Sequence, residues 1–279
     1  MEPLSLQELA ENIRCAPSFP SPPSIVISAR RLINDPNSTI KQIATLIESD
    51  PAVAGRILRV ANSALYGLSR KVSSIETALV VLGIRTTYQI IQAVGVASSF
   101  SGRLDPGFIQ RLTRHSVLVA TTCSLIAEGV GIRSDGEIYT AGLLHDMGHA
   151  VIQAAAPAHG AFLMTRGDPL EMDCKMEQRL IGVDHCGAGG LLVETWSLPE
   201  TLGQCMESHH QPLEEDTKPS IQGVVRLGVY LSEWFQQTKK REIPVIPEDH
   251  FASGVSVGEI FQSLEERMEE VVEMGKVLS

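Results

Sequence analysis

Aromatic residues are scarce in this sequence, making up 5% of its 279 residues. Apolar residues nevertheless reach 43% and charged residues 20%, which is typical of globular proteins. The core must therefore consist mainly of Leu, Ile, Val and Ala, a composition that favours helices. The length allows one large domain or two modest ones.

The sequence also lacks an excess of positive charge. It has 33 acidic and 23 basic residues, for a net charge of −10. Such a protein repels a phosphate backbone unless a local basic patch overcomes the field. The densest basic run, residues 239–241, is only three residues long. We therefore do not expect nucleic-acid binding, although a DNA-binding regulator stays open as a minor alternative.

Disulfide pairing and membrane insertion have little support in the sequence. The five cysteines are an odd number without a C-x-x-C pair, which indicates reduced thiols. The first thirteen residues are polar and acidic, unlike a signal peptide. The longest apolar stretches, such as residues 77–84, fall well short of the ~20 residues that span a bilayer. We expect a cytoplasmic protein that does not enter a membrane.

The sequence lacks the sustained alternation of apolar and polar residues that is typical of a half-buried strand. Signals for the start of a helix, in contrast, recur along the chain. Behind Thr39, for example, Ile40, Ile43, Ala44 and Ile47 follow helical spacing. The pattern predicts an all-α fold of about a dozen helices. Its predicted starts are the capping boxes Ser5–Glu8, Thr39–Gln42, Ser134–Glu137 and Ser256–Glu259, and the Asp-Pro pairs at 50–51 and 105–106.

Glycine, proline and serine cluster at residues 100–107, directly before a long helical segment. This seam predicts two packed helical lobes, residues 1–103 and 104–279, that share an apolar interface. A final acidic segment, residues 257–277, is predicted to form a helix.

An ordered series of histidines carries the chemical information: His115, His145-Asp146, His185 and His209-His210. Neutral imidazole and carboxylate are ligands of divalent transition metals, and a shared carboxylate can bridge two ions. Each member also has a plain alternative. His115 could be a satisfied core residue, His145-Asp146 a helix-end turn before Gly148, and the last pair helix-end cations. His149, His159 and His250 are interpreted as structural.

Four blocks resemble the HDOD family, the HD-related output domains of bacterial signalling proteins within the HD superfamily of phosphohydrolases. They cover about residues 16–215. The blocks are Phe19-Pro20-Ser21-Pro22-Pro23, residues 47–53 with 58–67 (including Asp50-Pro51 and Ala61-Asn62-Ser63), residues 73–78 with 82–83, and residues 182–185 with 191–199 (including Asp184-His185 and Trp196-Ser197-Leu198-Pro199).

The resemblance implies an HD-like helical domain in the second lobe. It also implies a metal site made of His115, His145, Asp146, His185, His209 and His210, which would hold Fe, Mn, Zn or Ni. The partners it implies are other signalling proteins with receiver, kinase or cyclic-dinucleotide domains, acting in trans. The sequence does not indicate the oligomeric state.

The chain departs from the active enzymes of the superfamily at three places. Their late metal-binding aspartate would fall near Val229, and no aspartate occurs between Asp216 and Asp249. His149 stands where the HD-GYP phosphodiesterases have lysine, and Gln211-Pro212 replaces their signature after His-His. We therefore assign no catalytic residue and expect a non-catalytic or degenerate signalling domain of a two-component or cyclic-dinucleotide network, working through protein contacts. The alternative is a metal-dependent phosphohydrolase acting on a nucleotide or cyclic dinucleotide.

Overall fold

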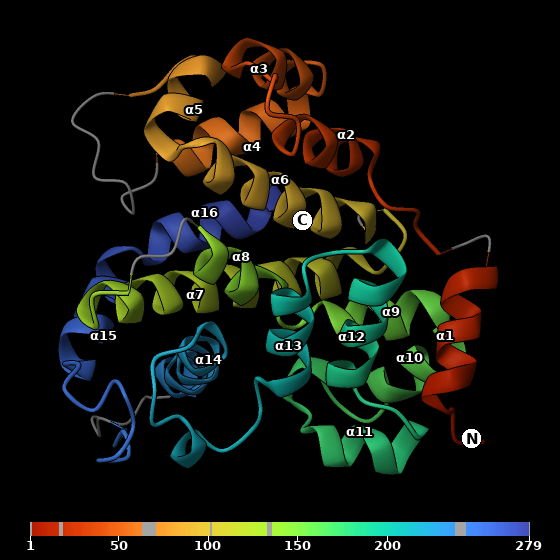
Figure 1. Ribbon diagram of the computed structural model, residues 1–279. Coiled ribbons are helices and arrows are strands. Elements are labelled where there is room, and N and C mark those ends of the chain that lie inside the picture. Colours follow the sequence, from red (N-terminus) through yellow and green to blue (C-terminus); the bar gives the residue numbers. More distant parts are fainter. Residues whose placement is uncertain are drawn as a thin grey trace.

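The computed structural model describes residues 2–16, 19–62, 71–100, 102–132, 136–237 and 244–278. Within these ranges the chain forms sixteen α-helices and no strand, so the predicted all-α fold is confirmed (Figure 1). The helices are α1 (Leu6–Cys15), α2 (Ser24–Ile33), α3 (Ile40–Glu48), α4 (Pro51–Ala61), α5 (Ile75–Leu82), α6 (Ile84–Phe100), α7 (Pro106–Gly129), α8 (Glu137–Leu144), α9 (Met147–Ala155), α10 (Pro157–Met164), α11 (Cys174–Ile181), α12 (His185–Trp196), α13 (Glu200–Ser208), α14 (Ile221–Gln237), α15 (Val257–Glu266) and α16 (Met268–Leu278).

Side-chain caps explain several helix starts. Complete capping boxes form at Ser5 and Thr39, and Ser256 accepts a hydrogen bond from the Glu259 amide. Asp105 caps α7, accepting from the Phe108 amide at 2.7 Å ahead of Pro106 at the first helical position. The predicted box at Ser134 and the basic run at 239–241 lie outside the described residues.

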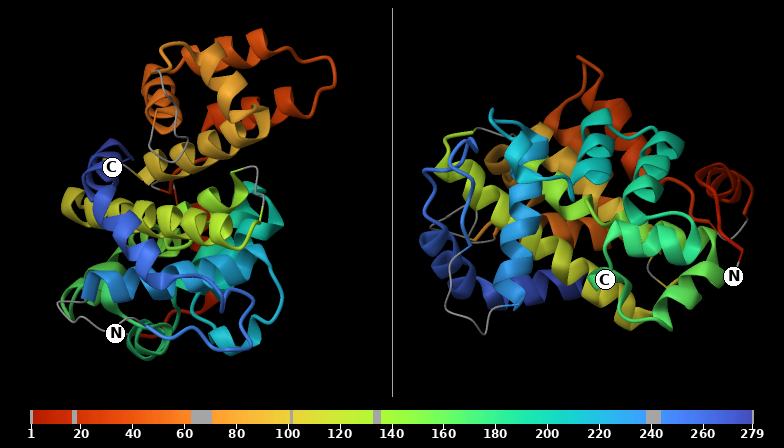
Figure 2. Two further views of the ribbon diagram at one scale, coloured as in Figure 1. Left: turned by 90° about the vertical axis from the view of Figure 1, so that its left-hand side faces the viewer. Right: turned by 90° about the horizontal axis from the view of Figure 1, so that it is seen from below.

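Helices α2 to α5 lie on one side of α6, separate from most of the second half of the chain (Figures 1 and 2). Helix α6 is buried over most of its length and also packs against α8, so it joins the two halves. Among the described residues no single helix has the length and hydropathy to cross a membrane, whereas α5 and α6 reach those values only together and meet at a bend of 111°.

The second half is organised around α7, which packs against α8, α14 and α16, and around α12, which packs against α9 and α13. Helix α1 lies against α12 and α9 instead of joining α2 to α5 (Figure 1), and the Leu4 amide donates to the Ile181 carbonyl at 2.7 Å. One apolar cluster runs from Leu4 to Leu278 through both halves. The boundary near residue 103 stays a prediction.

The acidic C-terminal segment forms two helices rather than one. Helix α15 ends at Glu266, Arg267 leaves helical geometry with φ −98° and ψ 3°, and α16 begins at Met268. Helix α16 buries Val271, Met274 and Leu278 against the rest of the protein. Both helices pack against α7.

Candidate metal centre

All six predicted site residues come together in the second half of the chain. His115 lies on α7, His145 and Asp146 join α8 to α9, His185 begins α12, and His209 and His210 follow α13. The Asp146 carboxylate is their common neighbour. Its oxygens lie 3.4 Å from His115 Nε2, 3.4 Å from His145 Nε2, 3.3 Å from His209 Nε2 and 3.8 Å from His185 Nε2.

Two donor sets meet at Asp146. One contains His115 and His145, the other His185, His209 and His210, and in each set the donor atoms lie within 4.8 Å of one another. His210 is the exposed member, with its ring centroid 4.2 Å from that of His209. A carboxylate between two sets of imidazoles is the arrangement in which one residue could serve two metal ions.

A close helix contact brings His185 to Asp146. Gly148, two residues after Asp146, lies directly against the start of α12. A Cβ built at Gly148 would lie 1.8 Å from the His185 carbonyl oxygen and 2.8 Å from the Gly189 amide nitrogen. The missing side chain therefore permits α9 and α12 to approach until the two site residues meet.

Backbone carbonyls orient two of the imidazole rings. His145 Nδ1 lies 2.8 Å from the Gly142 oxygen and His209 Nδ1 lies 2.8 Å from the Met206 oxygen. A carbonyl only accepts, so each Nδ1 carries the proton and each Nε2 presents a lone pair. Both lone pairs face the Asp146 carboxylate, another acceptor.

His185 is oriented by a buried acid. Glu177, on α11, accepts from His185 Nδ1 at 2.6 Å and from the His185 amide at 2.9 Å. The second Glu177 oxygen lies 3.3 Å from His149 Nδ1, and the His149 ring stacks on that of His185 with centroids 4.0 Å apart. Sequence reasoning missed Glu177 and treated His149 as structural. No local sequence pattern indicates that Glu177 orients His185, because the hydrogen bond joins two different helices, α11 and α12.

His115 differs from the other rings. Gln236 Nε2 lies 3.1 Å from its Nδ1, and an amide nitrogen donates, so Nδ1 accepts and Nε2–H faces Asp146. His115 therefore acts here as a donor to the carboxylate. For His115 Nε2 to bind a metal, the Gln236 side-chain amide would have to flip, so that its oxygen accepts a hydrogen bond from Nδ1–H.

Burial and charge set the protonation of the cluster. Burial lowers the pKa of His115 and of His209 to about 4, which keeps both rings neutral at neutral pH. Burial by itself would raise the pKa of Asp146, but the surrounding imidazoles outweigh it and hold that pKa well below the usual value. The pKa of His185 is raised despite its burial, because Cys174 and Glu177 stabilise its protonated form.

These residues fit a divalent metal. The buried Nε2 of His145 has no hydrogen-bond partner among the described residues. With His209 it directs a lone pair at a carboxylate, and facing acceptors repel each other unless a cation or proton lies between them. Neutral imidazoles held by their other nitrogen and a buried carboxylate are the usual ligands of Zn, Fe, Mn and Ni.

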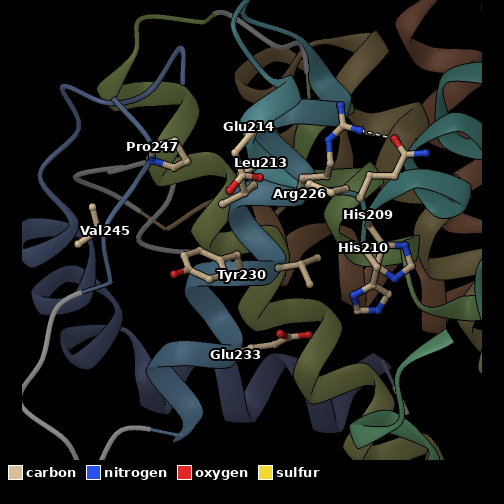
Figure 3. Close-up of a pocket in the computed structure, with 12 residues that line it drawn as sticks. His209, His210, Leu213, Glu214, Arg226, Tyr230, Glu233, Val245 and Pro247 are labelled. Atoms are coloured by element: carbon tan, nitrogen blue, oxygen red, sulfur yellow. Dashed lines mark hydrogen bonds between the residues drawn. The ribbon is translucent and has the colours of Figure 1, made fainter. Parts of the chain in front are cut away.

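A cavity of about 290 Å³ adjoins the cluster, lined by His209, His210 and one face of α14 (Figure 3). Val229, at the predicted position of the missing aspartate, lines this cavity and is buried. One helical turn later Glu233 lines it too, on the side where the histidine rings lie (Figure 3). Burial and the Asp146 charge raise the pKa of Glu233.

Sequence reasoning searched only for an aspartate near Val229 and missed Glu233. The signal was present, because residues four apart on a helix share a face. Arg226 lies in the same cavity wall but is already engaged: it donates to the Asp216 carboxylate at 2.8 and 2.6 Å and to Gln211 at 2.7 Å.

Comparison with known proteins agrees with the predicted family. The sequence profile of the HDOD domain matches residues 19–212, within the predicted 16–215. An HDOD domain protein of unknown function from Geobacter sulfurreducens superposes with a TM-score of 0.71 at 26% identity, over 98% of each chain. A candidate phosphohydrolase from Shewanella amazonensis SB2B has the same fold, with a TM-score of 0.72 at 23% identity over 98% of each chain.

A curated relative, an uncharacterised protein of Treponema pallidum (strain Nichols), is 23% identical over 234 residues. The match covers 81% of this chain and 44% of the relative, so the chain spans less than half of that protein's length.

Proposed function

The chain belongs to the HDOD domain family, and from this premise we propose that it is a metal-binding signalling domain that does not hydrolyse phosphate esters. Its output is contact with other proteins of a bacterial two-component or cyclic-dinucleotide network, through their receiver, kinase or cyclic-dinucleotide domains. The observation that carries the proposal is the pairing of an intact histidine–aspartate cluster with apolar Val229 at the position of the late aspartate.

The metal would be held by His145, Asp146, His185 and His209, with His210 at the exposed end and His115 next to Asp146. When bound, such an ion acts as a Lewis acid and lowers the pKa of bound water. The protein's own residues orient the ligands: the Gly142 and Met206 carbonyls fix two rings and Glu177 fixes a third.

The cavity is poorly suited to a phosphate ester. Its Arg226 guanidinium is already paired with the Asp216 carboxylate and donates to Gln211, so much of its positive charge is neutralised before a phosphoryl group could approach. Glu214 and Glu233 line the same cavity and place carboxylates near an incoming anion. Both features favour a regulatory role over hydrolysis.

Exposed apolar side chains on the helices beside α6 are where the proposed protein contacts should be sought. Ile27 on α2, Ile40 on α3 and Val80 on α5 are 51%, 41% and 71% exposed, and all belong to the group of helices packed on one side of α6. Apolar surface that remains in contact with water is typical of interaction sites when it is contiguous.

Metal analysis followed by turnover assays tests the proposal. The protein is stripped with chelator, reloaded separately with Mn²⁺, Fe²⁺, Zn²⁺ or Ni²⁺, and incubated with bis-p-nitrophenyl phosphate, nucleotides and cyclic dinucleotides. We expect bound metal that Asp146→Ala removes and His159→Gln, outside the cluster, retains. We expect no turnover with any metal. Pull-down against receiver, kinase and cyclic-dinucleotide domain proteins should find a specific partner.

The second candidate is a metal-dependent phosphohydrolase, and Glu233 favours it because a carboxylate one turn from Val229 lines the cavity. Metal-dependent hydrolysis that Asp146→Ala abolishes would establish this candidate and overturn the proposal. In that case Glu233→Gln should lower kcat by roughly 10²-fold or more, the usual loss for a positioned acid or base.

A further inference from the structure

Two cysteine thiols adjoin the histidine cluster. Cys174 is the first residue of α11 and Cys186 the second residue of α12, and their sulfur atoms lie 3.3 Å apart. Cys174 Sγ lies 4.0 Å from His185 Nε2, and Cys186 Sγ lies 4.0 Å from His209 Nε2. The two imidazole nitrogens are themselves 3.2 Å apart.

Four of the six donor-to-donor separations are close to those of a tetrahedral metal site. Zinc bonds of about 2.3 Å to sulfur and about 2.0 Å to nitrogen place two sulfurs about 3.8 Å apart, two nitrogens about 3.3 Å apart, and sulfur and nitrogen about 3.5 Å apart. Each of these four separations lies within about 0.5 Å of its tetrahedral counterpart, and the donor atoms of Cys174, His185 and Cys186 all lie within 4.8 Å of one another.

The hydrogen bond between the two thiols lowers the pKa of Cys174 to about 6 and raises that of Cys186, so a bound cation is needed to make both sulfurs thiolates. Both cysteines lie in the first turn of a helix, where the helix dipole stabilises a negative sulfur. Cys186 is buried and Cys174 half-buried, so the pair has little water to solvate its charge. Two thiolates would neutralise a divalent ion held with two neutral imidazoles.

We propose that Cys174, Cys186, His185 and His209 form a second, Cys₂His₂ donor set that binds zinc. The inference rests on the proposed metal centre, because it uses two of the same histidines. Once His185 has released its Nε2 proton to solvent, each Nε2 has one lone pair, so an ion in this set withdraws His185 and His209 from Asp146. The four protein ligands close the coordination sphere and leave no position for water. Zinc in this set would therefore hold the centre in a form that cannot activate water.

Cobalt(II) reports the ligands directly. Chelator-treated wild-type protein is kept reduced with a phosphine and titrated with Co²⁺, and its absorption spectrum is recorded. We expect a near-ultraviolet thiolate-to-cobalt charge-transfer band. Cys174→Ser and Cys186→Ser should each lose about half of its intensity and the double variant all of it, because each sulfur contributes one ligand. Cys15→Ser, which removes an exposed thiol on α1, should keep the full band.

The outcomes separate this inference from the proposed function. Cobalt that binds with visible ligand-field bands but no charge-transfer band would show a nitrogen and oxygen site, which overturns the thiolate set and leaves the Asp146 centre standing. Failure of the wild type to bind cobalt or zinc would overturn both.

A measurement on the unaltered chain covers the case in which a serine variant does not fold. Iodoacetamide labelling of the wild-type thiols is followed by mass spectrometry with and without Zn²⁺. Zinc should slow alkylation of Cys174 by roughly tenfold or more, because a metal-bound thiolate is no longer a free nucleophile. Alkylation of Cys15 should not change. Equal labelling of Cys174 with and without zinc would refute the inference.

Discussion

Asp146 is the residue at which the chemistry of the centre concentrates. It lies between α8 and α9, is 4% exposed, and has four imidazole nitrogens within 3.8 Å. A buried carboxylate needs positive charge or hydrogen bonds around it. In the metal-free chain, protonated His185 and the His115 Nε2–H supply them, whereas His145 and His209 present lone pairs that an ion would use.

Glu177 should control metal affinity without touching the metal. Glu177→Gln keeps the shape of the side chain but removes the charge that orients His185. We expect metal affinity to fall by roughly 10- to 100-fold, the usual effect of losing a partner of a ligating histidine. Calorimetric titration of the stripped protein measures it, with surface Glu171→Gln as the control. Equal affinities for the two variants would show that His185 does not depend on Glu177.

Acid should destabilise the metal-free protein even within the mild range. His115 and His209 have folded pKa values of about 4, below the usual value of 6.5, so between pH 6.5 and pH 4 the unfolded chain binds more protons than the folded one. The free energy of unfolding must therefore fall as pH falls through this window.

Two other groups do not cancel this effect. The folded pKa of His185 is raised, so His185 opposes the effect while the unfolded chain takes up its proton near pH 6.5, but this single group cannot cancel two histidines with lowered pKa values. The folded pKa of Glu177 is lowered to about 2. The stability that this carboxylate contributes is therefore lost only as pH falls below about 4.5. Urea unfolding with chelator at pH 7 and pH 5 measures the effect, and His115→Gln should show a smaller difference. Equal stability of the wild type at both pH values would contradict the assignment of neutral histidines.

At the scale of elements, the contact between α9 and α12 determines whether the site forms. Gly148→Ala would force a methyl group onto the His185 backbone, which cannot move without separating the two helices. We expect a loss of about 3 kcal/mol or more in unfolding free energy, at the upper end of overpacking effects, together with loss of bound metal.

Gly55→Ala is the matched control for this prediction. It makes the same chemical change on α4, where a new Cβ meets nothing within 4 Å. This substitution should leave metal binding unchanged and stabilise the protein by up to about 1 kcal/mol, because alanine is the better helix former. Similar behaviour of the two variants in chemical unfolding would mean that the predicted crowding at Gly148 is wrong.

At the scale of the whole molecule, a bound metal should stabilise the fold. The ligands come from four separated stretches of the chain, on α7, at the α8–α9 junction, on α12 and after α13, and these converge only in the folded state. An ion at 100 times its Kd adds about 2.7 kcal/mol to the unfolding free energy. We expect chelator to lower Tm by roughly 5 °C or more.

Calorimetry of loaded and stripped protein measures this linkage. Asp146→Asn is the control, since its Tm should respond little to chelator. A wild-type Tm that does not change when metal is removed would indicate that no ion is bound by the folded chain.

Much of the architecture was determined by the sequence itself. Helix starts were predictable because a capping side chain bonds to an amide only a few residues away, and Ser5, Thr39, Asp105 and Ser256 all cap as predicted. The all-α class followed from helical spacing of apolar residues, and the family from contiguous motifs matched over residues 19–212. The histidine series could be predicted to meet because of that family pattern.

Tertiary structure alone decided what surrounds those histidines. Glu177 reaches His185 from α11, Gln236 reaches His115 from α14, and Cys174 lies 3.3 Å from Cys186, and none of these pairs has a local spacing rule. The placement of α1 against α12 and the bend at Arg267 are of the same kind. Short-range bonding is encoded in neighbouring residues, whereas contacts between helices depend on how all the apolar faces pack together, which no single stretch of sequence specifies.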